Sequence, residues 1–250
     1  IFVVPKKGYS RSFAMFATRY GSIDMRFKLD GRQADTPAGV AHFLEHKMFD
    51  TKEGNALQIF SQNGASPNAF TSFDMTAYYF ECADKFKENL EVLLSFVSQP
   101  YFTPESVQKE QGIIGQEIQM YDDHPVWAAM EGLLDALYTT HPIRVKIAGT
   151  RESIAQITDK TLYDCHRAFY SPSNMVLCVC GDVDADQVEA MARRILPEDP
   201  GPQIVRDYGG REDDKQVRAP GFSRSMEVAM PVFVLGFKLP EAEPGPGWLR

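Results

Sequence analysis

Two histidines and a glutamate stand close together in the sequence, at a spacing that suits a metal site. His42, Glu45 and His46 form the pattern His-x-x-Glu-His, which is the inverted order of the commoner zinc-binding pattern His-Glu-x-x-His. An α-helix turns by about 100° per residue, so His42 and His46 would lie one turn apart on one face with Glu45 beside them. Two neutral imidazoles can then bind one Zn²⁺ while the carboxylate activates a water molecule.

Local signals predict that this pattern lies on a helix. Thr36 is a typical N-cap residue, Pro37 suits the first helical position, and residues 38–49 contain no further proline. Lys47 points about 100° away from His46 and is expected to face solvent. Histidines at this spacing also occur as ordinary core or surface residues, so the metal interpretation needs a third ligand from elsewhere in the chain.

Length and composition exclude several classes of protein. The 250 residues, 44% of them hydrophobic, suffice for one large domain or two small ones with a buried core. The net charge of −8 argues against a nucleic-acid partner and an anionic membrane surface, and no apolar run reaches the length of a membrane span. Since residue 1 is an isoleucine in an apolar run, we expect the natural chain to start further upstream.

The cysteines indicate a reducing compartment. Four of them are too few and too scattered for a disulfide scaffold: Cys82, Cys165, Cys178 and Cys180. Cys178 and Cys180 alternate on an apolar segment, and we expect them to be buried thiols rather than a metal pair. A cytoplasmic location is the corresponding prediction.

Strand-like and helix-like segments are interleaved along the chain, which predicts an α+β fold with a mixed or antiparallel sheet covered by several helices. Strands are expected at residues 1–4, 12–19, 68–82 (turning at 72–74) and 174–181, and further helices at 55–62, 86–97, 103–121, 126–138, 152–157, 160–170 and 185–196. Residues 25–35 and 197–221 are polar or rich in Pro and Gly, and we expect loops there.

The helix expected at residues 103–121 offers a third ligand. Glu110 and Glu117 are seven residues apart and lie on one helical face to within about 20°. Their apolar neighbours, which indicate that this helix is partly buried, are Val107, Ile113, Ile114 and Ile118. One carboxylate could reach the metal while the other orients a histidine, or both could be solvated surface groups.

Further short motifs follow one another along the chain. They are Tyr20-Gly21-Ser22, Gly39-Val40-Ala41-His42-Phe43-Leu44-Glu45-His46, Asn68-Ala69-Phe70-Thr71 with Thr76-Ala77-Tyr78, Glu110 to Glu117-Ile118, Ala148-Gly149-Thr150, and Tyr170 with Asn174-Met175 and Gly181-Asp182. This order is typical of the pitrilysin/insulysin family of zinc metallopeptidases, which includes the mitochondrial processing peptidases. Residues 1–196 therefore resemble the N-terminal half of such an enzyme, one half of a clamshell.

The resemblance implies a role for each polar residue of the motifs. His42, His46 and Glu117 would bind Zn²⁺, and Glu45 would be the general base that removes a proton from water and later delivers it to the leaving amine. Glu110 would support a ligand without touching the metal. The implied activity is that of a zinc-dependent endopeptidase.

The resemblance also implies how substrate and partner are bound. Asn68 and Ala69 would lie on an edge strand that pairs with the backbone of an unfolded peptide, a mode largely independent of the peptide's sequence. A homologous second half or partner subunit, which could make the protein a dimer, would supply an arginine and a tyrosine that act on the substrate. We expect residues 1–222 to form the N-terminal half-domain and residues 223–250 a terminal strand or linker towards the second half.

Two alternatives belong to other functional classes. The first is a non-catalytic structural or peptide-holding subunit of a two-chain complex, but such members of the family usually show a degraded zinc motif, and this motif is intact. The second is a structural zinc site, which would need four protein ligands, and no fourth candidate is evident. The remaining histidines match no ligand position and are expected to be surface or hydrogen-bonded residues: His124, His141 and His166.

Overall fold

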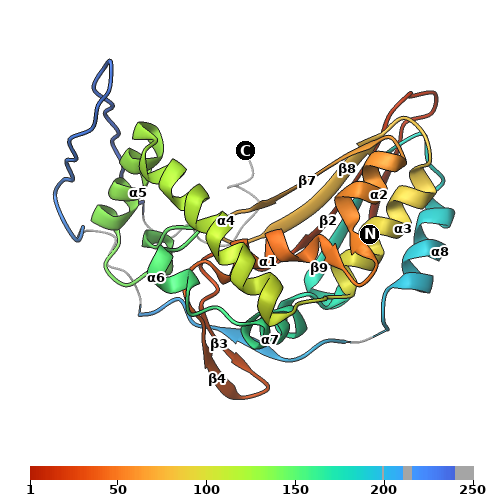
Figure 1. Ribbon diagram of the computed structural model, residues 1–250, viewed down its shortest axis with the longest axis horizontal. Helices are drawn as coiled ribbons and strands as arrows, with labels where there is room; N and C mark the ends of the chain where they lie inside the picture. Colours follow the sequence, from red (N-terminus) through yellow and green to blue (C-terminus); the bar gives the residue numbers. More distant parts are fainter. Residues whose placement is uncertain (199, 211–215, 240–250) are drawn as a thin grey trace.

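The core of the fold is a five-stranded mixed sheet with the strand order β1-β9-β2-β8-β7 (Figure 1). The computed structural model describes residues 1–198, 200–210 and 216–239. The strands of the sheet are β1 (Phe2–Pro5), β2 (Ser12–Thr18), β7 (Ala65–Thr71), β8 (Thr76–Cys82) and β9 (Met175–Gly181). Only β1 and β9 run parallel, and β7 is an edge of the sheet beside β8. The α+β fold with a mixed sheet is confirmed.

One face of this sheet carries the hydrophobic core. In β2, Ala14, Phe16 and Thr18 are buried, whereas the residues between them are only half-buried. The same period of two continues in β8 and β9, because successive side chains of a strand point to opposite faces. Helices pack on the buried face: α1 contacts β7 and β8, α3 contacts β2 and β8, and α8 contacts β1.

The helices divide between this layer and an arm beside it. They are α1 (Val40–Met48), α2 (Ala56–Gln62), α3 (Phe86–Ser98), α4 (Pro104–Asp122), α5 (Pro125–Leu137), α6 (Arg151–Ile154), α7 (Asp159–Phe169) and α8 (Ala185–Ile195), with 3₁₀ turns at Pro142–Arg144 and Pro172–Asn174. In Figure 1, α4 runs from beside α1 out to α5, so that α4 and α5 extend from the sheet as an arm. None of the helices in the described ranges combines the length and apolarity that a membrane crossing needs.

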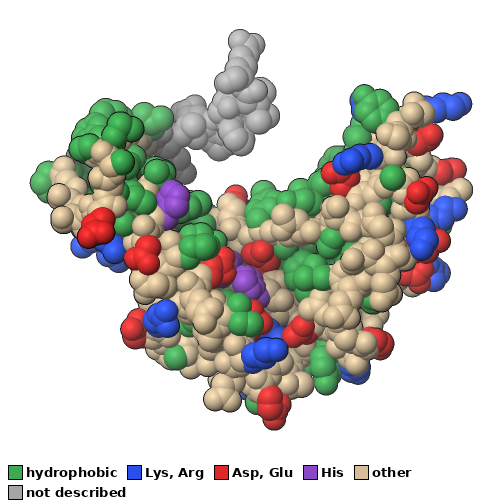
Figure 2. Space-filling model, turned by 45° about the horizontal axis from the view of Figure 1, so that its top comes forward, with side chains coloured by type: hydrophobic (Ala, Val, Ile, Leu, Met, Phe, Trp, Pro, Cys, Tyr) green, Lys and Arg blue, Asp and Glu red, His purple; other side chains and the backbone are tan. Residues whose placement is uncertain are grey.

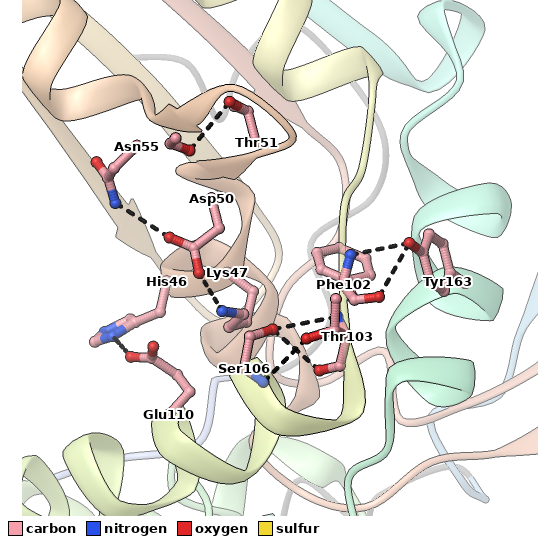
Figure 3. Close-up of polar contacts among 11 residues, drawn as sticks. His46, Lys47, Asp50, Thr51, Asn55, Phe102, Thr103, Ser106, Glu110 and Tyr163 are labelled. Atoms are coloured by element: carbon pink, nitrogen blue, oxygen red, sulfur yellow. Dashed lines mark hydrogen bonds and ion pairs between the residues drawn. The ribbon is translucent and has the colours of Figure 1, made fainter.

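The start of α4 is held firmly, and this determines where its side chains point. Thr103 and Ser106 form a reciprocal capping box, and Pro104 occupies the first helical turn. The Tyr163 hydroxyl of α7 accepts a hydrogen bond from the N–H of Phe102 at 2.9 Å and donates one to its carbonyl at 3.2 Å (Figure 3). Both backbone groups of Phe102, the residue before the N-cap, are therefore hydrogen-bonded to α7.

The expected cap of α1 is wrong. Thr36 does not begin the helix, because its N–H and its hydroxyl both donate to the carbonyl of Met25. The helix starts at Val40 after Gly39, which has a φ of 94° and no side-chain cap. A Cβ on Gly39 would lie 2.6 Å from the carbonyl oxygen of Ala148, so glycine is needed for both its conformation and its close packing.

The prediction of a polar loop at residues 25–35 is also wrong. These residues form a hairpin of β3 (Arg26–Leu29) and β4 (Arg32–Asp35). A third strand, β10 (Ile204–Arg206), pairs with β3 and lies within residues 197–221, where a second loop was expected. Only one face of this small sheet is apolar, so the hydrophobic pattern is weak. The turn is Asp30-Gly31, with both φ angles positive, which is a strong hairpin signal that the composition obscured.

Lys47 does not face solvent as expected. Its side chain is 1% exposed, and its ammonium group pairs with the Asp50 carboxylate, which also accepts a hydrogen bond from Asn55 Nδ2 at 3.2 Å (Figure 3). Asp50 and Asn55 face each other on the short hairpin of β5 (Asp50–Thr51) and β6 (Gly54–Asn55). Most of α1 is buried, so a direction away from His46 still leads into protein.

The cysteines differ in part from expectation, and the end of the chain is described only in part. All four thiols are free, but Cys178 and Cys180 are only half-buried, because their side chains lie on the face of the sheet opposite the helical layer. Residues 223–239 contain no helix or strand. The expectation of a terminal strand or linker over residues 223–250 stays a prediction. Residues 240–250 of that segment lie outside the described residues, and the boundary at residue 222 stays a prediction.

The buried His166 predicts an acid-sensitive fold. Burial lowers its pKa to about 4 although Nε2 donates to the carbonyl of Val97 at 2.9 Å, whereas an unfolded histidine has a pKa of about 6.5. Between these values the unfolded chain binds more protons, so stability falls as the pH drops from 6.5 to 4, by up to about 3 kcal/mol. Urea unfolding of the unsubstituted chain and of His166→Gln at several pH values checks this: the loss between pH 7 and pH 4.5 should be smaller in the variant, and equal losses would contradict it.

Candidate metal centre and its cleft

His42, His46 and Glu117 meet at the contact between α1 and α4. One ligand atom from each lies within 4.8 Å of the others. The Nε2 atoms of His42 and His46 lie 3.6 and 3.3 Å from the two carboxylate oxygens of Glu117. The two histidines come from one face of α1, as their spacing predicts, and Glu117 comes from the fourth turn of the capped helix α4.

The electrostatics of this group favour a bound cation. Burial lowers the pKa of His46, but hydrogen bonds and charges from Glu110 and Glu117 outweigh it and raise the pKa to about 10. Hydrogen bonds from His42 and His46 in turn hold the pKa of Glu117 far below its usual range. Two imidazole nitrogens and a carboxylate converging at this distance are a donor set that suits Zn²⁺.

Glu110 orients one of the histidines. The Nδ1 atom of His46 lies 3.0 Å from Glu110 Oε1 (Figure 3), so this nitrogen carries the proton and donates it. Nε2, which faces Glu117, is then the nitrogen that would offer its lone pair to a metal after giving up its proton. Residue spacing alone left open which of the two glutamates reaches the metal position, whereas the family resemblance implied Glu117. In the structure Glu117 faces both histidines and Glu110 contacts the other side of the His46 ring.

Tyr121 is a site residue that sequence reasoning missed. One helical turn after Glu117, it donates its hydroxyl to Glu117 Oε1 at 2.7 Å. Burial and the neighbouring Glu117 charge raise the pKa of this tyrosine, so it stays a donor. Its ring packs edge-on against Trp127 at a centroid distance of 5.8 Å. The signal that could have found it is a tyrosine four residues after a candidate ligand on the same helical face.

The centre opens into a cleft of about 600 Å³. Its floor is α1 with Glu45, one wall is the end of β7, and the other is the apolar side of the α4–α5 arm, with Trp127, Met130 and Leu134. Figure 2 shows this hollow, with histidine and acidic side chains at its base and hydrophobic side chains along its rims. Asn68 and Ala69 lie on the edge strand β7 at the rim.

The histidines outside the motif do not join the group formed by His42, His46 and Glu117. His166 is bonded to the Val97 carbonyl in the core, and Nδ1 of His141 accepts a hydrogen bond from the N–H of Ile143 at 3.1 Å. His124 is the residue before α5. Within the described residues, no other group of three or more His, Cys, Asp or Glu side chains converges as His42, His46 and Glu117 do.

The sequence matches two family profiles. Residues 31–151, which contain His42, Glu45, His46 and Glu117, match the profile described as "Insulinase (Peptidase family M16)". Residues 156–246 match the profile described as "Peptidase M16 inactive domain". The second match begins downstream of the metal centre and includes none of its residues.

Known relatives cover most of this chain. It is 48% identical over 212 residues to the uncharacterized zinc protease YmfH of Bacillus subtilis, covering 83% of this chain and 50% of that protein. It is 32% identical over 186 residues to the uncharacterized zinc protease ML0855 of Mycobacterium leprae, covering 71% of this chain and 41% of that protein. The chain thus spans about half the length of the curated relatives it matches.

A solved structure agrees with the fold. The crystal structure of a putative M16-like peptidase from Alicyclobacillus acidocaldarius superposes with a TM-score of 0.82 at 42% sequence identity. The match covers 87% of this chain and 52% of that one. The similarity therefore extends over one half of a larger molecule.

The contact between Glu110 and His46 predicts a measurable effect on metal affinity. Glu110→Gln keeps an acceptor but removes the charge that makes the imidazole a stronger ligand, so the zinc dissociation constant should rise about tenfold or more. Competition with a chromophoric chelator measures it. Glu105→Gln, an exposed position in the first turn of the same helix, is the matched control and should leave the affinity unchanged; equal affinities for all three proteins would contradict the role of Glu110.

Proposed function

The chain belongs to the insulinase family of peptidases, M16, and from this premise we propose that it is the metal-binding half of a zinc-dependent endopeptidase. Its substrates would be unfolded peptides. The observation that carries the proposal is the convergence of His42, His46 and Glu117 beside Glu45 at the base of an open cleft. A metal held by these three residues would keep a coordination position open towards the cleft, as hydrolytic zinc sites require.

The residues divide the work between binding and proton transfer. His42, His46 and Glu117 would hold Zn²⁺, which when bound supplies Lewis-acid polarisation of the scissile carbonyl. Glu45 lies one residue before a ligand and lines the same cleft. Its carboxylate would take the proton of the attacking water and pass it to the leaving amine, which is the ordinary task of a general base that turns into an acid.

The edge strand supports peptide binding through the main chain. β7 pairs with β8 on one side only among the described strands, so its outer edge can pair with an extended peptide. The N–H of Ala69 donates to Asn68 Oδ1 at 2.8 Å, a contact that a peptide carbonyl could replace. Such binding is nearly independent of the peptide's sequence. The apolar wall of Trp127 and Met130 faces this edge across the cleft and would accept hydrophobic side chains of the substrate.

A second half of similar fold is the proposed partner. The face of the sheet away from the helices carries a group of half-buried, mostly apolar side chains. They form two rows across neighbouring strands: Tyr79, Met15 and Cys178 in one, and Glu81, Phe13 and Cys180 in the other. Val176 on the same face is 42% exposed. A largely apolar sheet face of this kind is typical of an interface, and the matches cover only 50% and 52% of two of the relatives.

The alternative of a non-catalytic, peptide-holding subunit has less support. That role needs the edge strand and the cleft but neither a metal nor a base. Here two histidines, the ligand carboxylate, the supporting Glu110 and the base candidate Glu45 are all present and oriented. A subunit that only holds peptides would not require this cluster of partly buried charges.

Glu45→Gln separates metal binding from catalysis. The amide keeps the size of the side chain but cannot accept the proton of water. Cleavage of an unfolded peptide by this chain paired with the proposed second half should therefore fall by at least 100-fold, while the zinc content stays near one per chain. Peptide hydrolysis and metal analysis of both proteins measure this. Equal cleavage rates would remove Glu45 from the mechanism, and zinc without cleavage in the unsubstituted protein would favour the peptide-holding alternative.

The open sheet face predicts where the second half docks. Val176→Lys places a charge on the proposed interface, so the affinity of this chain for a separately produced second half should fall at least tenfold. Val205→Lys, which is 55% exposed on β10, is the control and should have no effect. Sedimentation of the mixtures measures association, and equal loss in both variants, or none, would argue against this face.

A further inference from the structure

The base candidate Glu45 is itself held by a residue to which no role has been given. The hydroxyl of Thr71 donates a hydrogen bond to Glu45 Oε2 at 2.6 Å. This is the short distance typical of a hydroxyl bonded to an ionised carboxylate. The contacts of the described residues give Glu45 Oε1 no hydrogen-bond partner, and Glu45 lines the cleft.

The single proton of the Thr71 hydroxyl is committed to this contact. Thr71 and Thr76 face each other across the β7–β8 ladder with their hydroxyl oxygens 3.3 Å apart. Thr76, however, donates its own proton to the carbonyl of Tyr20 at 2.9 Å. Each hydroxyl has one proton, so Thr76 bonds the backbone while Thr71 bonds Glu45.

The backbone around Thr71 is fixed from outside the strand. Thr71 is the last residue of β7, and the turn after it is closed by a 2.7 Å hydrogen bond from Ser72 to Met75. The segment at Gly21 supports this turn: a Cβ on Gly21 would lie 2.3 Å from the carbonyl oxygen of Phe73, and the N–H of Ser22 bonds the carbonyl of Ser72 at 3.1 Å. The donor of Thr71 is therefore anchored independently of α1.

We propose that Thr71 is a positioning residue, which holds one oxygen of the Glu45 carboxylate and thereby aims the other oxygen into the cleft. The inference rests on the proposed function, in which Glu45 is the base. Thr71 also ends the strand whose edge would pair with the peptide, only two residues after Ala69. A peptide that adds to this edge therefore steadies the same strand that orients the base, which links substrate binding to catalysis.

The kinetic test compares three substitutions in this chain when it is paired with the proposed second half. Thr71→Val keeps the shape but removes the hydroxyl, so kcat should fall roughly 10- to 100-fold with KM and zinc content unchanged. Thr71→Ser restores the hydroxyl and should recover most of kcat. Thr76→Val removes the neighbouring hydroxyl that does not touch Glu45 and should leave kcat within about twofold.

A second measurement needs no activity. In the metal-free protein, a double-mutant cycle of Thr71→Val and Glu45→Ala should show coupling of about tenfold in the unfolding equilibrium constant, because the hydrogen bond is charge-assisted. If the effects of the two substitutions on the free energy of unfolding were simply additive, Thr71 and Glu45 would not interact and the proposal would be wrong.

The outcomes separate this inference from the proposed function. Cleavage by the unsubstituted protein with an unchanged kcat for Thr71→Val, or a serine variant as slow as the valine variant, overturns the role of Thr71 alone. Loss of zinc from Thr71→Val also overturns it, because the residue would then serve metal assembly. No cleavage by the unsubstituted protein would instead defeat the proposed function.

Discussion

The site depends on one packing contact, that of α4 against α1. The histidines follow each other on one helix, but the carboxylate that completes the group comes from a second helix, and its position is correct only if α4 has the right phase and distance. Several backbone contacts determine both. The capping box at Thr103 and the Tyr163 hydroxyl fix where α4 begins. At the other helix, the close approach of Gly39 to Ala148 fixes where α1 begins.

The same contact brings several carboxylates close together, and a bound cation would reduce their mutual repulsion. Glu45, Glu110 and Glu117 surround two imidazoles in a partly buried site, and the raised pKa of His46 with the lowered pKa of Glu117 are both responses to it. A metal ion that binds only the folded state would stabilise the fold by mass action. It would also displace the proton that the carboxylates hold on His46, so metal affinity should depend on pH. Metal binding and folding are therefore coupled in the proposed function.

The sequence predicted the elements that carry the site better than it predicted their environment. The hairpin of β7 and β8 and the helices α3, α4 and α7 form close to where they were expected. Their apolar residues recur at regular spacing, and Thr103 and Thr158 cap α4 and α7. Lys47 was placed wrongly because a helical wheel gives a direction and does not show what packs there. The hairpin β3–β4 was missed because its strands carry little apolar pattern, although Asp30-Gly31 marked the turn. Tyr121 and Thr71 hold their carboxylates through side-chain hydrogen bonds, the second of them between separate elements, and such contacts leave little trace in the spacing of residues.

The most direct test of the account is to locate the metal. Diffraction data collected just above and just below the zinc absorption edge, from crystals of protein purified with Zn²⁺, give the position of zinc independently of any activity. We expect one anomalous peak of zinc within bonding distance of His42 Nε2, His46 Nε2 and the Glu117 carboxylate, with none in crystals of His46→Ala. A fully loaded protein whose zinc lies elsewhere, or an empty site at saturating Zn²⁺, would contradict the account.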